Sequence, residues 1–220
     1  MGINRYENGS WKEINDLQCL RNGEWQTAEL RRYDGTEWEQ LWPCHFTLTK
    51  QYPLSAFIVT SRRSSPQQVS SDYLVTGASS TASTNYVHDS LLFFPMDEMA
   101  ADLTGADILK ASLQLKRLPK QDDDGQNTAS ITIGCALSGA DPSATNNTWS
   151  REYTDLIGST VNFNRGQTKD VAIDTAGVTA LLSGNADCLC LPTGTLQTYN
   201  TQGYAFFDPA ATILTVTYFI

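Results

Sequence analysis

The sequence is poor in histidine and in basic residues. It has 2 histidines, His45 and His88, and 15 Lys and Arg against 24 Asp and Glu, for a formal net charge of -9. Without a basic stripe, the electrostatic attraction that supports binding to nucleic acid or to anionic membrane surfaces is missing. No stretch approaches the roughly 20 apolar residues of a transmembrane helix, and the N-terminus lacks the basic and apolar regions of a signal peptide. We therefore expect no nucleic-acid partner and no membrane insertion.

Motifs for common catalytic chemistry are also missing. Neither histidine belongs to a His-Glu-x-x-His pattern, and the sequence has no Gly-x-Ser-x-Gly elbow and no phosphate-binding Gly-Lys-Ser/Thr loop. Two histidines leave few candidates for a base that titrates near neutral pH. We therefore predict a protein that is not an enzyme, with no catalytic residues and no cofactor. A glycosidase with paired carboxylates stays open, because its two acids meet in space and not in sequence.

The cysteines form an odd set without a paired spacing: Cys19, Cys44, Cys135, Cys188 and Cys190. Such a set suits free thiols in a reducing cytosol. Cys188 and Cys190 would share one face of a strand, but with Cys44 and His45 they lack the spacing of zinc ligands. The acidic run QDDDGQN at 121–127 lacks the alternation of an EF-hand loop and is better explained as a solvated hairpin tip. We predict no metal site.

Three segments near the N-terminus repeat one pattern, an Asn-Gly or Asp-Gly pair closely followed by tryptophan. They are NGSWKEI at 8–14, NGEWQTA at 22–28 and DGTEWEQL at 34–41. Asn-Gly and Asp-Gly favour tight hairpin turns, because both central residues need positive φ. The repeated spacing of Trp11, Trp25 and Trp38 therefore predicts three successive hairpins within residues 1–43.

These hairpins need additional contacts, because an isolated two-stranded hairpin is marginally stable in water. Three interpretations of Trp11, Trp25 and Trp38 remain open. The tryptophans fill a small sheet made by the hairpins themselves, or they join the chain to a partner or to copies of itself. The third and least favoured interpretation is that sugars stack on them. We take them as assembly and docking residues, and residues 1–43 as an attachment module.

The rest of the chain has the pattern of an antiparallel β protein. The stretch LWPCHFTLTKQYP at 41–53 carries two prolines, and we predict a linker at 44–53. Beyond it, many short strands are separated by Gly, Ser, Asn and Asp, which predicts a jelly-roll-like antiparallel β-sandwich over residues 54–220. Alternation marks the following residues as inward-facing: Leu109, Ala111, Leu113 and Leu115; Ile131, Ile133, Cys135 and Leu137; Leu214, Val216 and Tyr218.

We expect one short helix in this otherwise all-β fold, within residues 174–185. Asp174 is placed as its N-cap, and Gly184 lies near its end. Val178, Leu181 and Leu182 form its apolar stripe. The helix would cover one end of a sheet.

Residues 54–220 resemble the DNRLRE domains, carbohydrate-binding-module-like β-sandwiches of secreted and surface proteins. Four stretches carry the resemblance: NYVHDSLLFFPMDEM (85–99), ADILKASLQL (106–115), VAIDTAGVTALLSGN (171–185) and YAFFDPAATILTVTY (204–218). They mark a fold and not a site, and the hexapeptide that names the family is absent. The N-terminal segments are similar to the Asn-Gly-x-Trp hairpin repeats of tail and fibre proteins of bacteriophages and prophages.

Together the two resemblances imply a structural protein of a phage particle, such as a tail, tail-fibre or head-decoration component. Such a protein is assembled in the cytoplasm of a bacterial host and located in the virion. Its expected partners are other virion proteins and further copies of itself, in a homo-oligomer. Host attachment through a surface glycan is a further expectation, since repeated copies turn weak contacts into avidity. A free-standing carbohydrate-binding module or a small glycan-active enzyme remains the alternative.

Four aromatic residues in polar, loop-like stretches are the candidates for glycan binding. They are Trp149 and Tyr153 in NNTWSREYTD, and Tyr199 and Tyr204 in LQTYNTQGYAFF. An exposed ring near amide or carboxylate groups would suit a sugar. The competing interpretation is that these rings are buried at loop ends, where they add stability.

Overall fold

The computed structural model describes residues 3–7, 10–14, 18–21, 24–27, 30–33, 35–36, 38–42, 47–62, 66–81, 84–119, 127–144, 153–193 and 203–219. Strand residues far outnumber helical ones, and the sheets are antiparallel, which confirms the predicted all-β class. The chain divides into two compact units. One contains Met1–Thr47 with Phe219–Ile220, and the other contains Leu48–Tyr218.

The first unit contains three antiparallel hairpins. Strand β1 (Ile3–Glu7) pairs with β2 (Ser10–Ile14), β3 (Gln18–Arg21) with β4 (Glu24–Thr27), and β5 (Leu30–Tyr33) with β6 (Trp38–Trp42). In the first two hairpins, the residues that flank the Asn-Gly pair are themselves paired, as a two-residue turn requires. In the third, Tyr33 pairs with Trp38, so the connection that contains Asp34-Gly35 is longer than the predicted turn.

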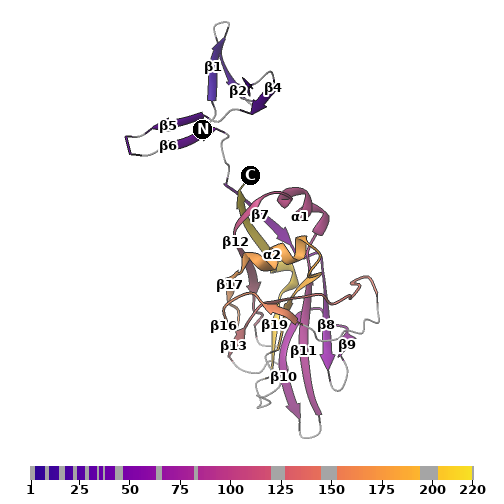
Figure 1. The fold of residues 1–220 in the computed structure, drawn as a ribbon. Helices are drawn as coiled ribbons and strands as arrows, with labels where there is room; N and C mark the ends of the chain where they lie inside the picture. Colours follow the sequence, from indigo (N-terminus) through magenta and orange to yellow (C-terminus); the bar gives the residue numbers. More distant parts are fainter. Residues whose placement is uncertain are drawn as a thin grey trace. The chain divides into compact units, whose positions relative to one another are not determined.

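The second unit is a sandwich of two main sheets (Figure 1). The larger sheet runs in the order β15 (Tyr153–Leu156), β14 (Gly134–Ala136), β18 (Cys188–Leu191), β11 (Thr84–Phe93), β10 (Leu74–Thr81) and β19 (Gly203–Phe207). Strand β8 (Ala56–Arg62) also pairs with β11 and, on its other side, with β9 (Pro66–Val69). The smaller sheet runs in the order β17 (Thr168–Ile173), β12 (Asp107–Lys116), β20 (Ile213–Phe219) and β7 (Thr47–Pro53). Strands β13 (Thr128–Ile131) and β16 (Val161–Asn164) form a separate pair.

The main core lies between these sheets. It includes Leu74, Leu92 and Leu189 from the larger sheet and Leu113 and Val216 from the smaller one. Successive side chains of a strand point to opposite faces of its sheet. The residues that precede and follow a core-facing residue in the larger sheet therefore point away from the main core, to the other side of that sheet. There a second buried cluster forms from Ile58, Leu91, Phe93, Ala136, Cys188 and Cys190. Burial on both faces explains why SLLFF and DCLCL are apolar without alternation.

Two α-helices, α1 (Met96–Leu103) and α2 (Thr175–Leu182), lie toward one end of the sandwich (Figure 1). Helix α2 begins as predicted, since the Asp174 carboxylate accepts a hydrogen bond from the Ala176 N–H at 2.9 Å. Gly184, with φ of 74°, follows its end. A short 3-10 helix, η1 (Pro209–Ala211), precedes β20.

The prediction of a single helix was wrong, because α1 was not expected. Asp97 and Glu98 lie in its first turn, where negative charge is favourable. Met99 and Leu103, four residues apart, are buried against the core. This helix is difficult to predict from periodicity alone, because it is short and an apolar run and Pro95 come directly before it.

Most of the predicted inward-facing residues are buried, namely Ala111, Leu113, Leu115, Ile131, Ile133, Cys135, Leu214, Val216 and Tyr218. Two are not. Leu109 is 55 % exposed because the pairing of β12 with β17 begins only at Ala111. Leu137 is 56 % exposed because β14 ends at Ala136.

The predicted linker at 44–53 also needs correction, because residues 47–53 form β7. This strand pairs with β20 in the smaller sheet. Tyr52 is fully buried in the main core, and its hydroxyl donates to the Asp102 carboxylate at 3.1 Å. Pro53 is the last residue of β7, an edge strand of the smaller sheet, where a proline is compatible with strand pairing.

Candidate functional site

The three predicted docking tryptophans occupy equivalent backbone positions. Each pairs across its hairpin with an aromatic or aliphatic residue on the strand before the turn: Trp11 with Tyr6, Trp25 with Leu20, and Trp38 with Tyr33. Over the described part of residues 1–42, the hairpins form three separate two-stranded sheets. The sequence repeat is thus also a repeat of strand register.

The structure describes the side chain of one predicted glycan-binding residue, Tyr204, which is half-buried in β19. Tyr153 is the first residue of β15, but its side chain lies outside the described set. Trp149 and Tyr199 lie outside the described residues. The structure therefore does not bring these four residues together in one described site.

Tyr204 instead belongs to a row of rings that we call the aromatic strip: His88, Tyr204, Phe206 and Tyr73. His88 of β11 and Tyr204 of β19 both pair with Gly77 of β10, and their rings meet edge to face with centroids 4.5 Å apart. The Phe206 ring lies 6.3 Å from Tyr204 and 6.4 Å from Tyr73, also edge to face. Gly77, with φ of 124°, has no side chain that would separate its two ring-bearing neighbours.

The strip is partly open to solvent. Tyr73 is exposed, and His88, Tyr204 and Phe206 are half-buried. Burial lowers the pKa of His88 from its usual 6.5, against the opposing effect of the Asp89 carboxylate. Its ring atom Nδ1 is buried without a hydrogen-bond partner among the described residues. His88 is therefore a neutral ring of the strip at pH 7, and this environment does not favour its protonation.

Strand β11 changes partner next to the strip, and we call this point the strand fork. Its N-terminal half pairs with β10 and its C-terminal half with β18, while β8 continues along its other edge. The Ser90 hydroxyl fills the gap, accepting from the Val75 N–H at 2.7 Å and donating to the Val75 carbonyl at 2.8 Å. Thr193 donates its N–H to the Asp89 carboxylate at 2.6 Å and accepts at its hydroxyl from the Gly77 N–H at 2.7 Å. Polar side chains thus replace the ladder bonds that are lost where the strands diverge.

Two of the cysteines considered above as zinc ligands, Cys188 and Cys190, lie in an apolar environment. The thiols of Cys188 and Cys190 are buried on one face of β18, and burial raises the pKa of the Cys188 thiol. A protonated thiol is a poor metal ligand. Cys44 and His45 lie outside the described residues. Across the residues that are described, no three His, Cys, Asp or Glu side chains gather as metal ligands.

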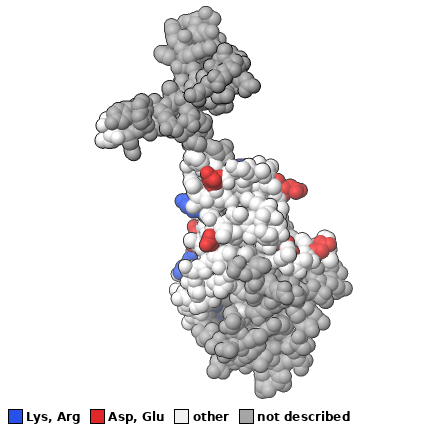
Figure 2. Space-filling view, viewed as in Figure 1, with Lys and Arg blue, Asp and Glu red and all other residues white. Residues whose placement is uncertain are grey.

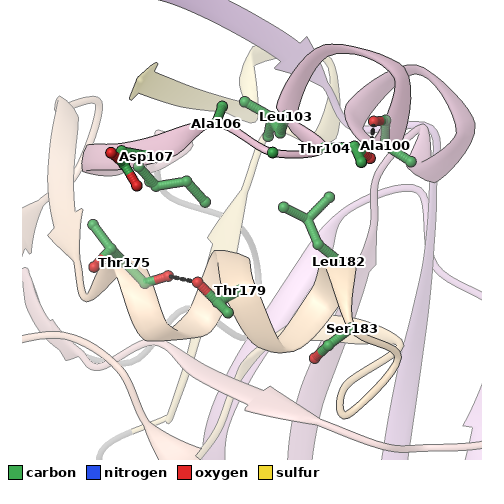
Figure 3. A pocket seen from close by; sticks show the side chains of 11 residues that line it. Ala100, Leu103, Thr104, Ala106, Asp107, Thr175, Thr179, Leu182 and Ser183 are labelled. Carbon is green, nitrogen blue, oxygen red and sulfur yellow. Dashed lines mark hydrogen bonds between the residues drawn. The ribbon is translucent and has the colours of Figure 1, made fainter. Parts of the chain in front are cut away.

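A hollow of about 460 Å³ lies between α1, α2 and the turn that leads from α1 into β12 (Figure 3). Four of its lining residues are apolar and buried or half-buried: Leu103, Ala106, Ile108 and Leu182. Hydroxyl and carboxylate groups line the rest: Thr104, Asp107, Thr175, Thr179 and Ser183. Figure 3 shows Asp107 and Thr175 toward one end and Ser183 toward the other. No sequence motif marks this hollow, because its residues come from two separate stretches, 100–108 and 175–183.

The described surface of the sandwich carries few charges on the face seen in Figure 2. Most of it is uncharged, the acidic side chains are spaced apart, and Lys and Arg lie at one margin. None of the helices in the described ranges is long and apolar enough to cross a membrane.

Comparison with known proteins gives no family for this chain: no protein-family model and no curated protein matches it.

Proposed function

We propose that the protein is a non-enzymatic structural component of a bacteriophage particle, in which the N-terminal hairpins attach the chain and the sandwich is displayed. The observation that carries this proposal is the equivalent register of Trp11, Trp25 and Trp38 in three separate hairpins. A lone two-stranded hairpin is marginally stable, and an indole gains most when another surface buries it. Other virion proteins and sister subunits are the partners that would supply this surface.

The resemblance of the hairpin repeats to those of phage tail and fibre proteins supports the same conclusion. It favours a location in the virion, as a tail, fibre or decoration component. A free-standing carbohydrate-binding module would need no such repeated attachment unit.

In the same proposal, the aromatic strip is the part of the sandwich that contacts a host-surface glycan. Tyr73 and Tyr204 each combine an apolar ring with a polar hydroxyl, which suits a sugar with apolar C–H faces and hydroxyl edges. Phe206 lies between them. Single contacts of this kind are weak, so binding would depend on several copies of the chain in one particle.

The attachment role is tested on the full-length chain by analytical ultracentrifugation and by incorporation into particles. We expect the wild-type protein to self-associate or to bind a particle protein, and the triple variant Trp11→Ala, Trp25→Ala, Trp38→Ala to lose this binding. A matched control replaces the residue after each tryptophan, namely Lys12, Gln26 and Glu39, because successive strand positions alternate between faces. If the wild-type chain is monomeric and enters no particle, the attachment role is wrong.

The glycan role has a separate test on a glycan array displaying bacterial surface sugars. We expect Tyr73→Ala and Tyr204→Ala each to reduce binding, and Leu109→Ala, which changes an exposed apolar residue outside the strip, to leave it unchanged. Equal binding by all variants would remove the strip from the proposal. Glycan binding by a chain that enters no particle would favour the free-standing module.

A further inference from the structure

We propose that the hollow between α1 and α2 binds a small organic cation, a protonated primary amine on a compact aliphatic or polyhydroxylated stem. This goes beyond the proposed virion role, because the hollow uses no residue of the hairpins or of the aromatic strip. Its ligand chemistry follows from charge, from hydrogen-bonding capacity and from the apolar lining.

The charge of the lining favours a cation. Both helices contribute their last turns to the hollow, through Leu103 and the C-cap Thr104 of α1 and Leu182 and the C-cap Ser183 of α2. Helix α2 also contributes its first residue, Thr175. A helix C-terminus carries partial negative charge, which a basic residue in the last turn often balances. Neither helix has a basic residue there. Asp107 adds a full negative charge, and the lining residues include no Lys or Arg.

Three of the four hydroxyl groups of the lining, those of Thr104, Thr179 and Ser183, are committed as donors. Thr104 donates to the Ala100 carbonyl at 2.6 Å, and Thr179 donates to the Thr175 carbonyl at 3.1 Å. Ser183 likewise donates to a helix carbonyl, at 3.2 Å. Because a hydroxyl has one proton and two lone pairs, these oxygens keep the capacity to accept. These three oxygens therefore favour a ligand that brings donors, and an ammonium group brings three.

The apolar residues give a place for the stem of the ligand. Leu103 is buried, and Ala106, Ile108 and Leu182 are half-buried beside it. Covering them with C–H groups removes apolar surface from water. The volume of about 460 Å³ lies within the range of small-molecule sites, which is about 300–1,000 Å³. A hexosamine or a short alkylamine would be enclosed in part, with its ammonium near Asp107.

The test is an NMR titration of the full-length protein, labelled at Leu and Ile methyl groups. Two matched pairs of probes separate charge from stem: pentylamine with 1-pentanol, and glucosamine with glucose. We expect the amines to shift the methyl signals of Leu103, Ile108 and Leu182 with a Kd on the order of 1 mM, and the neutral partners to bind several-fold more weakly. Tighter binding of pentylamine would identify a lysine-like aliphatic amine, and tighter binding of glucosamine an amino sugar.

Variants then locate the site. We expect Asp107→Asn to weaken both amines by about three- to fivefold, the size of an exposed charge pair, and added salt to weaken them as well. Asp170→Asn, which removes an exposed carboxylate of β17 outside the hollow, is the matched control and should change nothing. Ala100→Tyr should fill the hollow and abolish binding. The proposal fails if the neutral probes bind as tightly as the amines, if Asp107→Asn has no effect, or if the shifted signals lie elsewhere. Particle attachment is unaffected by any of these outcomes.

Discussion

Ser90 is the residue on which the strand fork depends most directly. Its side chain is fully buried, and its hydroxyl makes both hydrogen bonds to Val75. Ser90→Ala removes one oxygen atom and leaves the N–H and the C=O of a buried residue without these partners. An unsatisfied buried polar group costs about 1–3 kcal/mol, so the variant should lose about 2–6 kcal/mol of the free energy of unfolding. That is a large share of the roughly 5–15 kcal/mol that stabilises a typical domain.

Hydrogen exchange followed by mass spectrometry measures this loss. Amides in buried strands exchange through opening of the unit that contains them, so their protection reports its stability. In Ser90→Ala, we expect exchange of peptides from β10 and β11 to accelerate by at least about 30-fold, since each 1.4 kcal/mol is a factor of ten. Peptides from the N-terminal hairpins belong to the other unit and serve as an internal reference.

Ser112→Ala is the matched control, because Ser112 lies in β12, is half-buried and forms part of neither the fork nor the strip. It should change stability by less than about 0.5 kcal/mol. If Ser90→Ala accelerates exchange by less than threefold, another group satisfies Val75 and the fork does not depend on Ser90.

Three further predictions concern single residues of the sandwich: His88, Cys188 and Gly177. Because burial lowers the pKa of His88, its contribution to stability is complete above the unfolded pKa of 6.5 and declines as the pH falls through the lowered folded value. His88→Phe should remove this decline when urea unfolding at pH 7.5 and 5 is compared, and an unchanged decline would assign it to another group. Burial also raises the pKa of the Cys188 thiol, so we expect iodoacetamide at pH 8 to label Cys188 only after the protein is unfolded. Mass spectrometry measures this labelling. Labelling of Cys188 in the native protein would contradict its burial. Gly177→Ala would place a Cβ against the buried Ile157 side chain. This overpacking costs about 1–3 kcal/mol, more than the gain of about 1 kcal/mol in helix propensity, so the Tm should fall. Adding Ile157→Val should restore part of the lost Tm. A rise in Tm for Gly177→Ala alone would mean that the Ile157 side chain moves aside freely.

Local signals were sufficient where the chain is locally regular. The alternation in the last strand places Leu214, Val216 and Tyr218 in the core, as the sequence indicates. Helix α2 has its own start and stop signals in Asp174 and Gly184, and the structure uses both. The first two Asn-Gly pairs likewise specify their turns, because a two-residue hairpin restricts its central residues to positive φ.

Local signals failed where strand pairing decides the outcome. Leu109 continues the alternation of β12, but the periodicity of the sequence does not reveal that pairing with β17 starts two residues later, at Ala111. The aromatic strip joins residues that are far apart in the sequence, Tyr73, His88, Tyr204 and Phe206, because β10 and its two partners align them. Of these, only Tyr204 was suggested by its polar surroundings. The hollow between the helices depends on α1, which was not predicted.

The strand fork also determines where this protein tolerates change. Thr193 is tied to Asp89 and Gly77, and Gly203 is paired with Ala78, so both ends of the segment 194–202 are fastened to one sheet. The entropy of closing a loop grows only with the logarithm of its length. New or longer sequences grafted between these two anchors should therefore leave the strand register of the sandwich intact.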